Sequence, residues 1–222
     1  MKNLLISGAL GGLGSPMTNY FSSNGYQVLG TTSLSNTGKD SKNTKYYPIN
    51  LMDENAAHQL IEKLKREYTN LDAAILLVGG YAVNNLSNAK LSDYENMIKL
   101  NFFTAINLIK PVHKWLQETG GGDIFMIGSR PLFKGSSDEI LPYTLSKSLL
   151  LQLTFSLNES STENNIFTSL IVPGTIDTLI NRQQIPDADF TQWTKPQDIA
   201  YKIHASIQQK DISLKKSVIK LF

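Results

Sequence analysis

The chain opens with MKNLLISGALGGLGSPM (residues 1–17), a stretch that reads either as a secretion signal or as a β-strand entering a glycine-rich turn. Its apolar run ends after Leu4, Leu5 and Ile6, because glycines follow from Gly8 onward. A signal peptide needs roughly 7–15 apolar residues in succession. The strand-and-turn interpretation is therefore preferred, and it predicts a phosphate-binding turn at the end of the first strand.

Composition narrows the function classes. The 222 residues include 21 basic and 19 acidic side chains, so nothing favours nucleic acid or an anionic membrane as a partner. Cysteine is absent, which excludes disulfides and thiolate catalysis and fits a cytoplasmic location. The histidines, His58, His113 and His204, are far apart in the sequence, so we expect no metal site. These features favour a small molecule as the partner.

Short apolar segments alternate with longer amphipathic stretches along the chain. Helical patterns cover residues 54–68, 92–118 and 141–158, and Pro111 is expected to bend the second or to sit at a break in it. The alternation predicts an α/β fold, a single domain over residues 1–222 with a doubly wound, Rossmann-like parallel sheet and helices on both faces. We interpret the irregular stretch at about 178–195 as a flap. Buried strands are expected at residues 3–7, 27–31, 45–49, 73–78, 123–128 and 167–172, with a possible seventh at 217–222.

The glycine-rich turn has the spacing G-x-x-x-G-x-G, formed by Gly8, Gly12 and Gly14. Ligands of open parallel sheets bind beyond the carboxyl ends of the strands, where this turn is expected. Glycines let the backbone approach a pyrophosphate closely, and the next helix, with Ser15 and Pro16 at its start, points its N-terminal amides at the anion. The alternative is an ordinary strand-to-helix turn that uses glycine for its geometry alone.

A second motif, Y-x-x-x-K, lies at residues 143–147. Residues i and i+4 of a helix share a face, so the Tyr143 phenol and the Lys147 ammonium can point into one cleft. A nearby positive charge favours the phenolate, and we expect Lys147 to lower the pKa of Tyr143 from its usual value of about 10. Such a tyrosine can exchange a proton with a carbonyl or hydroxyl oxygen near neutral pH.

The glycine turn combined with Y-x-x-x-K resembles the short-chain dehydrogenase/reductase family over almost the whole chain. The resemblance implies an enzyme that transfers hydride from a nicotinamide, with Tyr143 as the proton donor and Lys147 on the nicotinamide ribose. It also implies that Ser129 holds the substrate oxygen and that Asn101 holds a proton-relay water. The stretch PGTIDT (residues 173–178) is similar to the family's nicotinamide-contacting P-G-x-x-x-T. The cofactor contacts implied by the turn and the resemblance are Gly8, Leu10, Gly12, Leu13, Gly14, Thr32, Ser33, Asn50, Leu51, Val78, Gly79, Gly80, Tyr143, Lys147, Pro173, Gly174, Ile176 and Thr178.

Within this family the chain most resembles the quinoid dihydropteridine reductases. The shared features are the Val78-Gly79-Gly80 turn, the segment IDTLINRQQIPDADFTQWTKPQDIA (residues 176–200) and a short last strand. One difference is Ser129, because those enzymes lack the catalytic serine that ordinary carbonyl reductases have. The implied substrate is a carbonyl- or quinonoid-type small molecule, with a dihydropterin as one candidate. The alternatives are a ketone or acyl-thioester reductase and a non-catalytic nicotinamide sensor.

The end of the second predicted strand bears on the choice of nicotinamide. NAD-specific relatives place an acidic residue there, whereas this chain has Thr32 followed by Ser33. No carboxylate repels a 2′-phosphate at this point, and Lys39 or Lys42 can neutralise it. We therefore expect NADP(H) in preference to NAD(H), although Gly11 stands where many NADP-binding relatives have an arginine.

Apolar residues near the motifs suggest a substrate wall and an assembly surface. The leucines at positions 145, 149, 153 and 157 form a stripe. This stripe is either an interface of a homodimer or homotetramer, which the family commonly forms, or the face packed against the sheet. The candidates for the wall, each of which ordinary packing would explain equally well, are Tyr81, Phe133, Leu141, Ile180 and Trp193.

Overall fold

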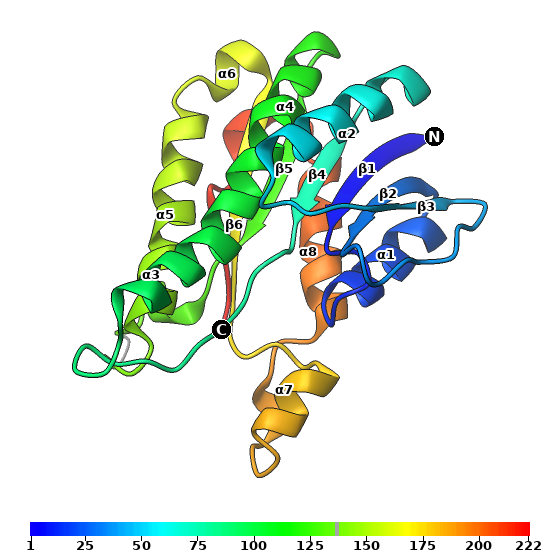
Figure 1. The fold of residues 1–222 in the computed structure, drawn as a ribbon. Coiled ribbons are helices and arrows are strands. Elements are labelled where there is room, and N and C mark those ends of the chain that lie inside the picture. Colours follow the sequence, from blue (N-terminus) through cyan, green and yellow to red (C-terminus); the bar gives the residue numbers. More distant parts are fainter. Residues whose placement is uncertain (136–137) are drawn as a thin grey trace.

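A computed structural model describes residues 1–135 and 138–222, and within these ranges seven parallel strands form one sheet (Figure 1). The strand order is β3-β2-β1-β4-β5-β6-β7, which confirms the predicted doubly wound sheet and its seventh strand. No helix in the described ranges is long and apolar enough to cross a membrane. The strands are β1 (Lys2–Ser7), β2 (Tyr26–Thr32), β3 (Thr44–Pro48), β4 (Ala73–Leu76), β5 (Gly122–Ile127), β6 (Ile166–Pro173) and β7 (Val218–Leu221).

Helices cover both faces of the sheet (Figure 1). One face carries α1 (Gly14–Ser23) and α8 (Pro196–Gln208). The other carries α2 (Glu54–Glu67), α4 (Thr104–Glu118) and α5 (Leu141–Asn158). The remaining helical elements are α3 (Leu91–Ile98), a π-helical turn (Lys99–Phe103), α6 (Ser161–Asn164), α7 (Leu179–Gln184) and 3-10 turns at Arg130–Leu132, Phe190–Gln192 and Ile212–Leu214.

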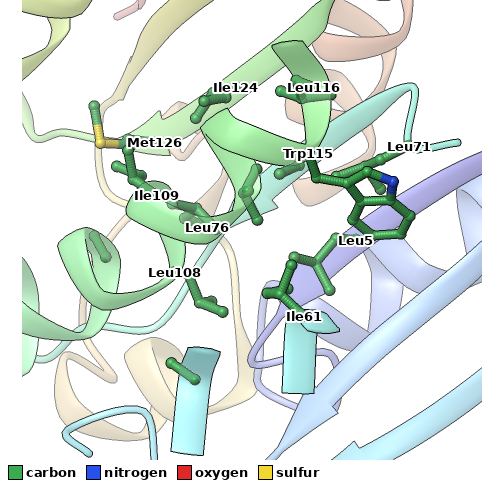
Figure 2. Close-up of a cluster of buried hydrophobic side chains, with 14 of the residues drawn as sticks. Leu5, Ile61, Leu71, Leu76, Leu108, Ile109, Trp115, Leu116, Ile124 and Met126 are labelled. Carbon is green, nitrogen blue, oxygen red and sulfur yellow. The ribbon is translucent and has the colours of Figure 1, made fainter. Parts of the chain in front are cut away.

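The central strands read as continuous apolar runs because helices cover them on both sides. Every residue of β2 and of β6 is buried, whereas β3 and β7 at the two edges keep exposed positions. The two faces form separate cores. In one of them, Trp115 of α4 is fully buried in the same cluster as Leu5 of β1 and Ile61 of α2 (Figure 2). Burial of apolar side chains on both faces therefore stabilises the sheet, whose strands carry the site at their carboxyl ends.

The helix predicted over residues 92–118 is irregular at a different place from the one expected. Pro111 lies inside α4 without a break, and the irregularity is the π-helical turn at Lys99–Phe103. A π-helical turn widens the helix locally and leaves carbonyl groups without their usual partners. The hydroxyl of Thr104 donates to the Leu100 carbonyl at 2.7 Å, which satisfies one of them. The turn carries Asn101, which is completely buried.

The leucine stripe of α5 is divided between two environments. Leu145 and Leu149 are exposed, while Leu153 and Leu157 pack against the core. The face against the sheet is formed instead by Pro142, Ser146, Lys147, Leu150 and Thr154. The interpretation of the whole stripe as a sheet-facing surface is therefore wrong for its first two members.

Candidate active site

The site lies where the strand order reverses, between β1 and β4. Ligands of doubly wound sheets bind beyond the carboxyl ends of the strands at this switch point. The Ser7 hydroxyl accepts hydrogen bonds from the Leu77 amide at 2.9 Å and from the Val78 amide at 3.3 Å. The end of β1 is thereby tied to the turn that follows β4, so both turns keep fixed positions.

The glycine turn leaves little room for a side chain at its glycine positions. Gly8 has a φ of 66°, and a Cβ at Gly14 would overlap the Gly8 carbonyl oxygen. A Cβ at Gly12 would lie 3.3 Å from the Thr178 side chain, so the turn faces the loop after β6 closely. No side chain caps the N-terminus of α1 among the described residues. The Ser15 amide already donates to the Gly11 carbonyl at 2.9 Å, and Pro16 has no amide hydrogen, so an anion at this helix start would be bound by the Leu13 and Gly14 amides.

Lys147 is buried beneath the site. Its Nζ donates to the Ile127 carbonyl oxygen at 3.0 Å, and the residue is 7% exposed. Burial lowers the pKa of the ammonium to about 8, because removing a charge from water disfavours the charged form. A Cβ at Gly79 would lie 3.2 Å from this Nζ. The amine is thus held under the turn after β4 and open to partners on the cavity side.

Tyr143 lies beside Ser129 and under Tyr81. Burial raises the pKa of the Tyr143 phenol, a hydrogen bond with the Ser129 hydroxyl lowers it, and Tyr81 raises it further. The Tyr81 ring meets the Tyr143 ring edge to face, with 5.0 Å between centroids. The structure contradicts the expected lowering of this pKa by Lys147. The Lys147 Nζ is 6.0 Å from the centre of the Tyr143 ring, and burial raises the pKa instead.

Asn101 lies in the π-helical turn and connects this turn to the turn after β4 and to α5. Its Oδ1 accepts from the Gly80 amide at 2.9 Å, and its Nδ2 donates to the Gly80 carbonyl at 3.1 Å and to the Ser146 hydroxyl at 2.9 Å. The Ser146 hydroxyl in turn donates to the Tyr143 carbonyl at 2.7 Å. Asn101 therefore does not lie on the solvent side of its helix. The Asn101 side chain instead fixes the glycine turn after β4 against the helix of Tyr143.

A cavity of about 570 Å³ is lined by nearly half of the predicted catalytic and cofactor residues. Among the described residues that line it, Arg130 and Lys147 are charged and none is acidic. A smaller cavity of about 280 Å³ lies between α2 and α4, away from these side chains. The predicted residues that line the larger cavity are Leu13, Gly79, Gly80, Tyr81, Ser129, Tyr143, Lys147, Pro173, Gly174, Ile176 and Ile180.

Two of the five residues predicted for the substrate wall line this cavity. Tyr81 and Ile180 line the cavity, whereas Phe133, Leu141 and Trp193 are not among its lining residues. Phe133 packs against the core, and the Trp193 ring packs on Phe190 with 4.8 Å between centroids. Sequence reasoning missed Arg130, Ile140, Asn181, Gln184 and Ile185, which line the cavity. Arg130 directly follows Ser129 in the sequence, and this adjacency could have indicated that it lines the site.

The predicted adenosine contacts lie apart from the cavity, beyond β2 and β3. Thr32 is buried, and its hydroxyl has no hydrogen-bond partner among the described residues. Ser33 and Asn50 are exposed, and the Asn50 Oδ1 accepts from the Met52 amide at 3.1 Å. Leu51 is buried in the core. A buried hydroxyl without a partner calls for one. It fits a ligand hydroxyl or phosphate at this position.

These features fit a nicotinamide dinucleotide along the carboxyl edge of the sheet. The unpartnered Thr32 hydroxyl suits the adenosine end, the uncapped α1 N-terminus suits the pyrophosphate, and buried Lys147 suits the nicotinamide ribose. The chain is thus built as a dinucleotide-binding α/β protein with a tyrosine and a lysine at the reactive end.

Comparisons with known proteins agree with this geometry. The family model for short chain dehydrogenases matches residues 2–189. The chain is therefore a member of the short-chain dehydrogenase/reductase family, an enzyme that depends on a nicotinamide cofactor.

Individual relatives differ in their named activities. The chain is 25% identical over 208 residues to a dihydropteridine reductase of Dictyostelium discoideum, covering 91% of this chain and 86% of that one. It is 24% identical over 186 residues to the 3-oxoacyl-[acyl-carrier-protein] reductase of Escherichia coli, covering 82% and 76%. The solved structure of ElxO with NADP bound superposes with a TM-score of 0.88 at 21% identity, covering 99% and 96%.

Lys147 gives the stability of the protein a pH dependence. Its pKa is about 8 in the folded chain, against about 10.4 for lysine in an unfolded chain. Between these values the unfolded chain binds more protons, so the free energy of unfolding rises with pH. We expect wild type to gain stability relative to Lys147→Met as pH rises from about 8 to about 10. Urea unfolding of both nucleotide-free proteins at pH 7.5 and 9.5 measures this.

The control is Lys202→Met, an exposed position on α8. A stability difference between wild type and Lys147→Met that stays constant across this pH range would contradict the depressed pKa.

Proposed function

We propose that the protein reduces a carbonyl- or quinonoid-type small molecule, with NADPH as the hydride source, in the cytoplasm. The observation that supports this most is the grouping of Ser129, Tyr143 and Lys147 at one cavity, where Ser129 is near enough to the Tyr143 phenol to lower its pKa. The cofactor, when bound, supplies the hydride. The protein supplies orientation and the proton.

Each side chain has a separate task in this proposal. Tyr143 donates its phenolic proton to the substrate oxygen, and its raised pKa keeps that proton in place at neutral pH. Ser129 positions the same oxygen through its hydroxyl. Lys147 would hold the nicotinamide ribose through its amino group. Asn101 is a positioning residue, because its amide fixes Gly80 and, through Ser146, the backbone of Tyr143.

Two substrate classes are supported by different features. The likeness to a dihydropteridine reductase supports a quinonoid dihydropterin. The presence of both Ser129 and Tyr143 at the cavity supports a ketone or acyl thioester, because a carbonyl oxygen can accept from two hydroxyls. The likeness to 3-oxoacyl-[acyl-carrier-protein] reductase supports the same class. We favour the general description, reduction of a polarised C=O or C=N bond, which both classes share.

The experiment that tests this function is a screen of NADPH and NADH oxidation with quinonoid dihydropterin, simple quinones, keto-esters and acyl thioesters. We expect turnover with at least one of them. Tyr143→Phe should lower kcat by about 10²–10⁴-fold, because it removes the proton donor, and should leave the dissociation constant for NADPH nearly unchanged. An active substrate on which Tyr143→Phe turns over like wild type would contradict the assignment.

The preference for NADP(H) rests on the end of β2. Thr32 and Ser33 have hydroxyl side chains there, and neither carries a carboxylate that would repel a 2′-phosphate. Ser33 is exposed, so Ser33→Asp adds a negative charge without burying it. We expect this change to raise the Michaelis constant for NADPH by about tenfold and to change that for NADH much less, because the carboxylate repels a 2′-phosphate.

The charge control is Thr69→Asp, which is exposed in the connection between α2 and β4. Equal effects of Ser33→Asp on both nucleotides would show that the 2′-phosphate is not bound at this strand end.

We also propose a homodimer or homotetramer that buries the outer face of α5. Leu145, Leu149 and Phe155 are 45%, 37% and 45% exposed on this one helix, and such apolar patches mark interfaces. Leu149→Asp should shift the protein to monomer in light scattering, whereas Leu214→Asp, 63% exposed on a 3-10 turn, should not. A wild type that is already monomeric would contradict this assembly.

A further inference from the structure

We propose that Thr194 is a positioning residue that fixes the loop after β6 for the nicotinamide half of the cofactor. This inference rests on the proposed function, because the loop matters only if a nicotinamide lies against it. Pro173, the last residue of β6, and Gly174, Thr175 and Ile176 of this loop all line the cavity of Tyr143 and Lys147. Thr194 itself does not line the cavity, so it acts through the loop.

The backbone of Thr194 pairs with the loop on both sides of Ile176. The Thr194 amide donates to the Thr175 carbonyl at 2.8 Å, and the Thr194 carbonyl accepts from the Asp177 amide at 2.9 Å. Together they form a short parallel bridge between Ile176 and Thr194. These two bonds do not depend on the side chain, so every variant at this position can keep them.

The Thr194 hydroxyl adds two bonds that depend on the side chain. It accepts from the Gly174 amide at 3.1 Å and donates to the Leu221 carbonyl at 3.0 Å. Leu221 is paired in register with Pro173, so the hydroxyl connects the first loop residue to the last strand of the sheet. Because one oxygen must both accept and donate, serine can replace threonine here, and valine or alanine cannot.

The position of Thr194 explains why these bonds matter for the cofactor. The chain leaves the sheet at Gly174, forms α7 and the Phe190–Gln192 turn, and returns at Thr194 (Figure 1). The Thr194 hydroxyl therefore connects the two ends of the segment 174–194 where it leaves and rejoins the sheet. Without the bond, the Gly174 amide and the Leu221 carbonyl each lose a partner, and the loop is free to move away from the nicotinamide site. The residues expected to contact the adenosine follow β2, which is separated from β6 in the sheet by β1, β4 and β5.

The test compares Thr194→Val with Thr194→Ser. The probes are NADPH and its adenine-side fragment 2′,5′-ADP, which lacks the nicotinamide, with dissociation constants measured by fluorescence or calorimetry. Thr194→Val should weaken NADPH binding by about tenfold, within the range expected when buried hydrogen bonds are lost, and change 2′,5′-ADP binding less than about twofold. Thr194→Ser should bind both probes like wild type.

Each outcome decides a separate question. NADPH binding by Thr194→Val equal to wild type overturns this inference. Equal weakening of both probes also overturns it, because the residue would then only support the fold. A wild type that binds neither NADPH nor NADH overturns the proposed function itself. If Thr194→Val does not fold, Thr194→Ala, which leaves space for a water at Gly174, takes its place with the same expected split.

Discussion

The site depends on the hydrogen bonds of one buried amide. Asn101 has no exposed surface, and it bonds Gly80 through both the backbone amide and the carbonyl while also donating to Ser146. A buried polar side chain without partners would be costly, so this arrangement is strongly favoured over looser ones. It sets the distance between the turn after β4 and the helix of Tyr143. A Cβ at Gly79 would lie 2.5 Å from the Asn101 Oδ1, so the turn must be glycine there.

The remaining chemistry follows from how little water reaches the two titrating groups. Burial lowers the pKa of Lys147 to about 8 and raises that of the Tyr143 phenol, so both groups are pushed toward their uncharged forms. An uncharged phenol is a proton donor. The Tyr143 phenol therefore carries its proton at neutral pH, as proton transfer from it to a substrate oxygen requires. The Ser129 hydroxyl moderates the effect, because its hydrogen bond lowers the same pKa.

The strands could be predicted from sequence because both faces of a parallel sheet are buried, and short continuous apolar runs such as 73–78 are typical of strands in that environment. The glycine turn and Y-x-x-x-K were also recognisable, since their spacing is local. The effect of Lys147 on Tyr143 was predicted wrongly, because it depends on burial and on the Ile127 carbonyl. Thr194 and the packing of Phe133 could not be predicted, because they rest on contacts between segments distant in sequence.

The central claim is that the carboxyl edge of β1 and β4 binds a nicotinamide nucleotide with its reactive end at Tyr143. A crystal structure of the protein soaked with NADPH measures this most directly. The account predicts the pyrophosphate at the start of α1, the nicotinamide ribose within hydrogen-bond distance of the Lys147 Nζ, and the Tyr143 hydroxyl facing the nicotinamide ring. A nucleotide bound elsewhere, or a ribose out of reach of Lys147, would contradict it.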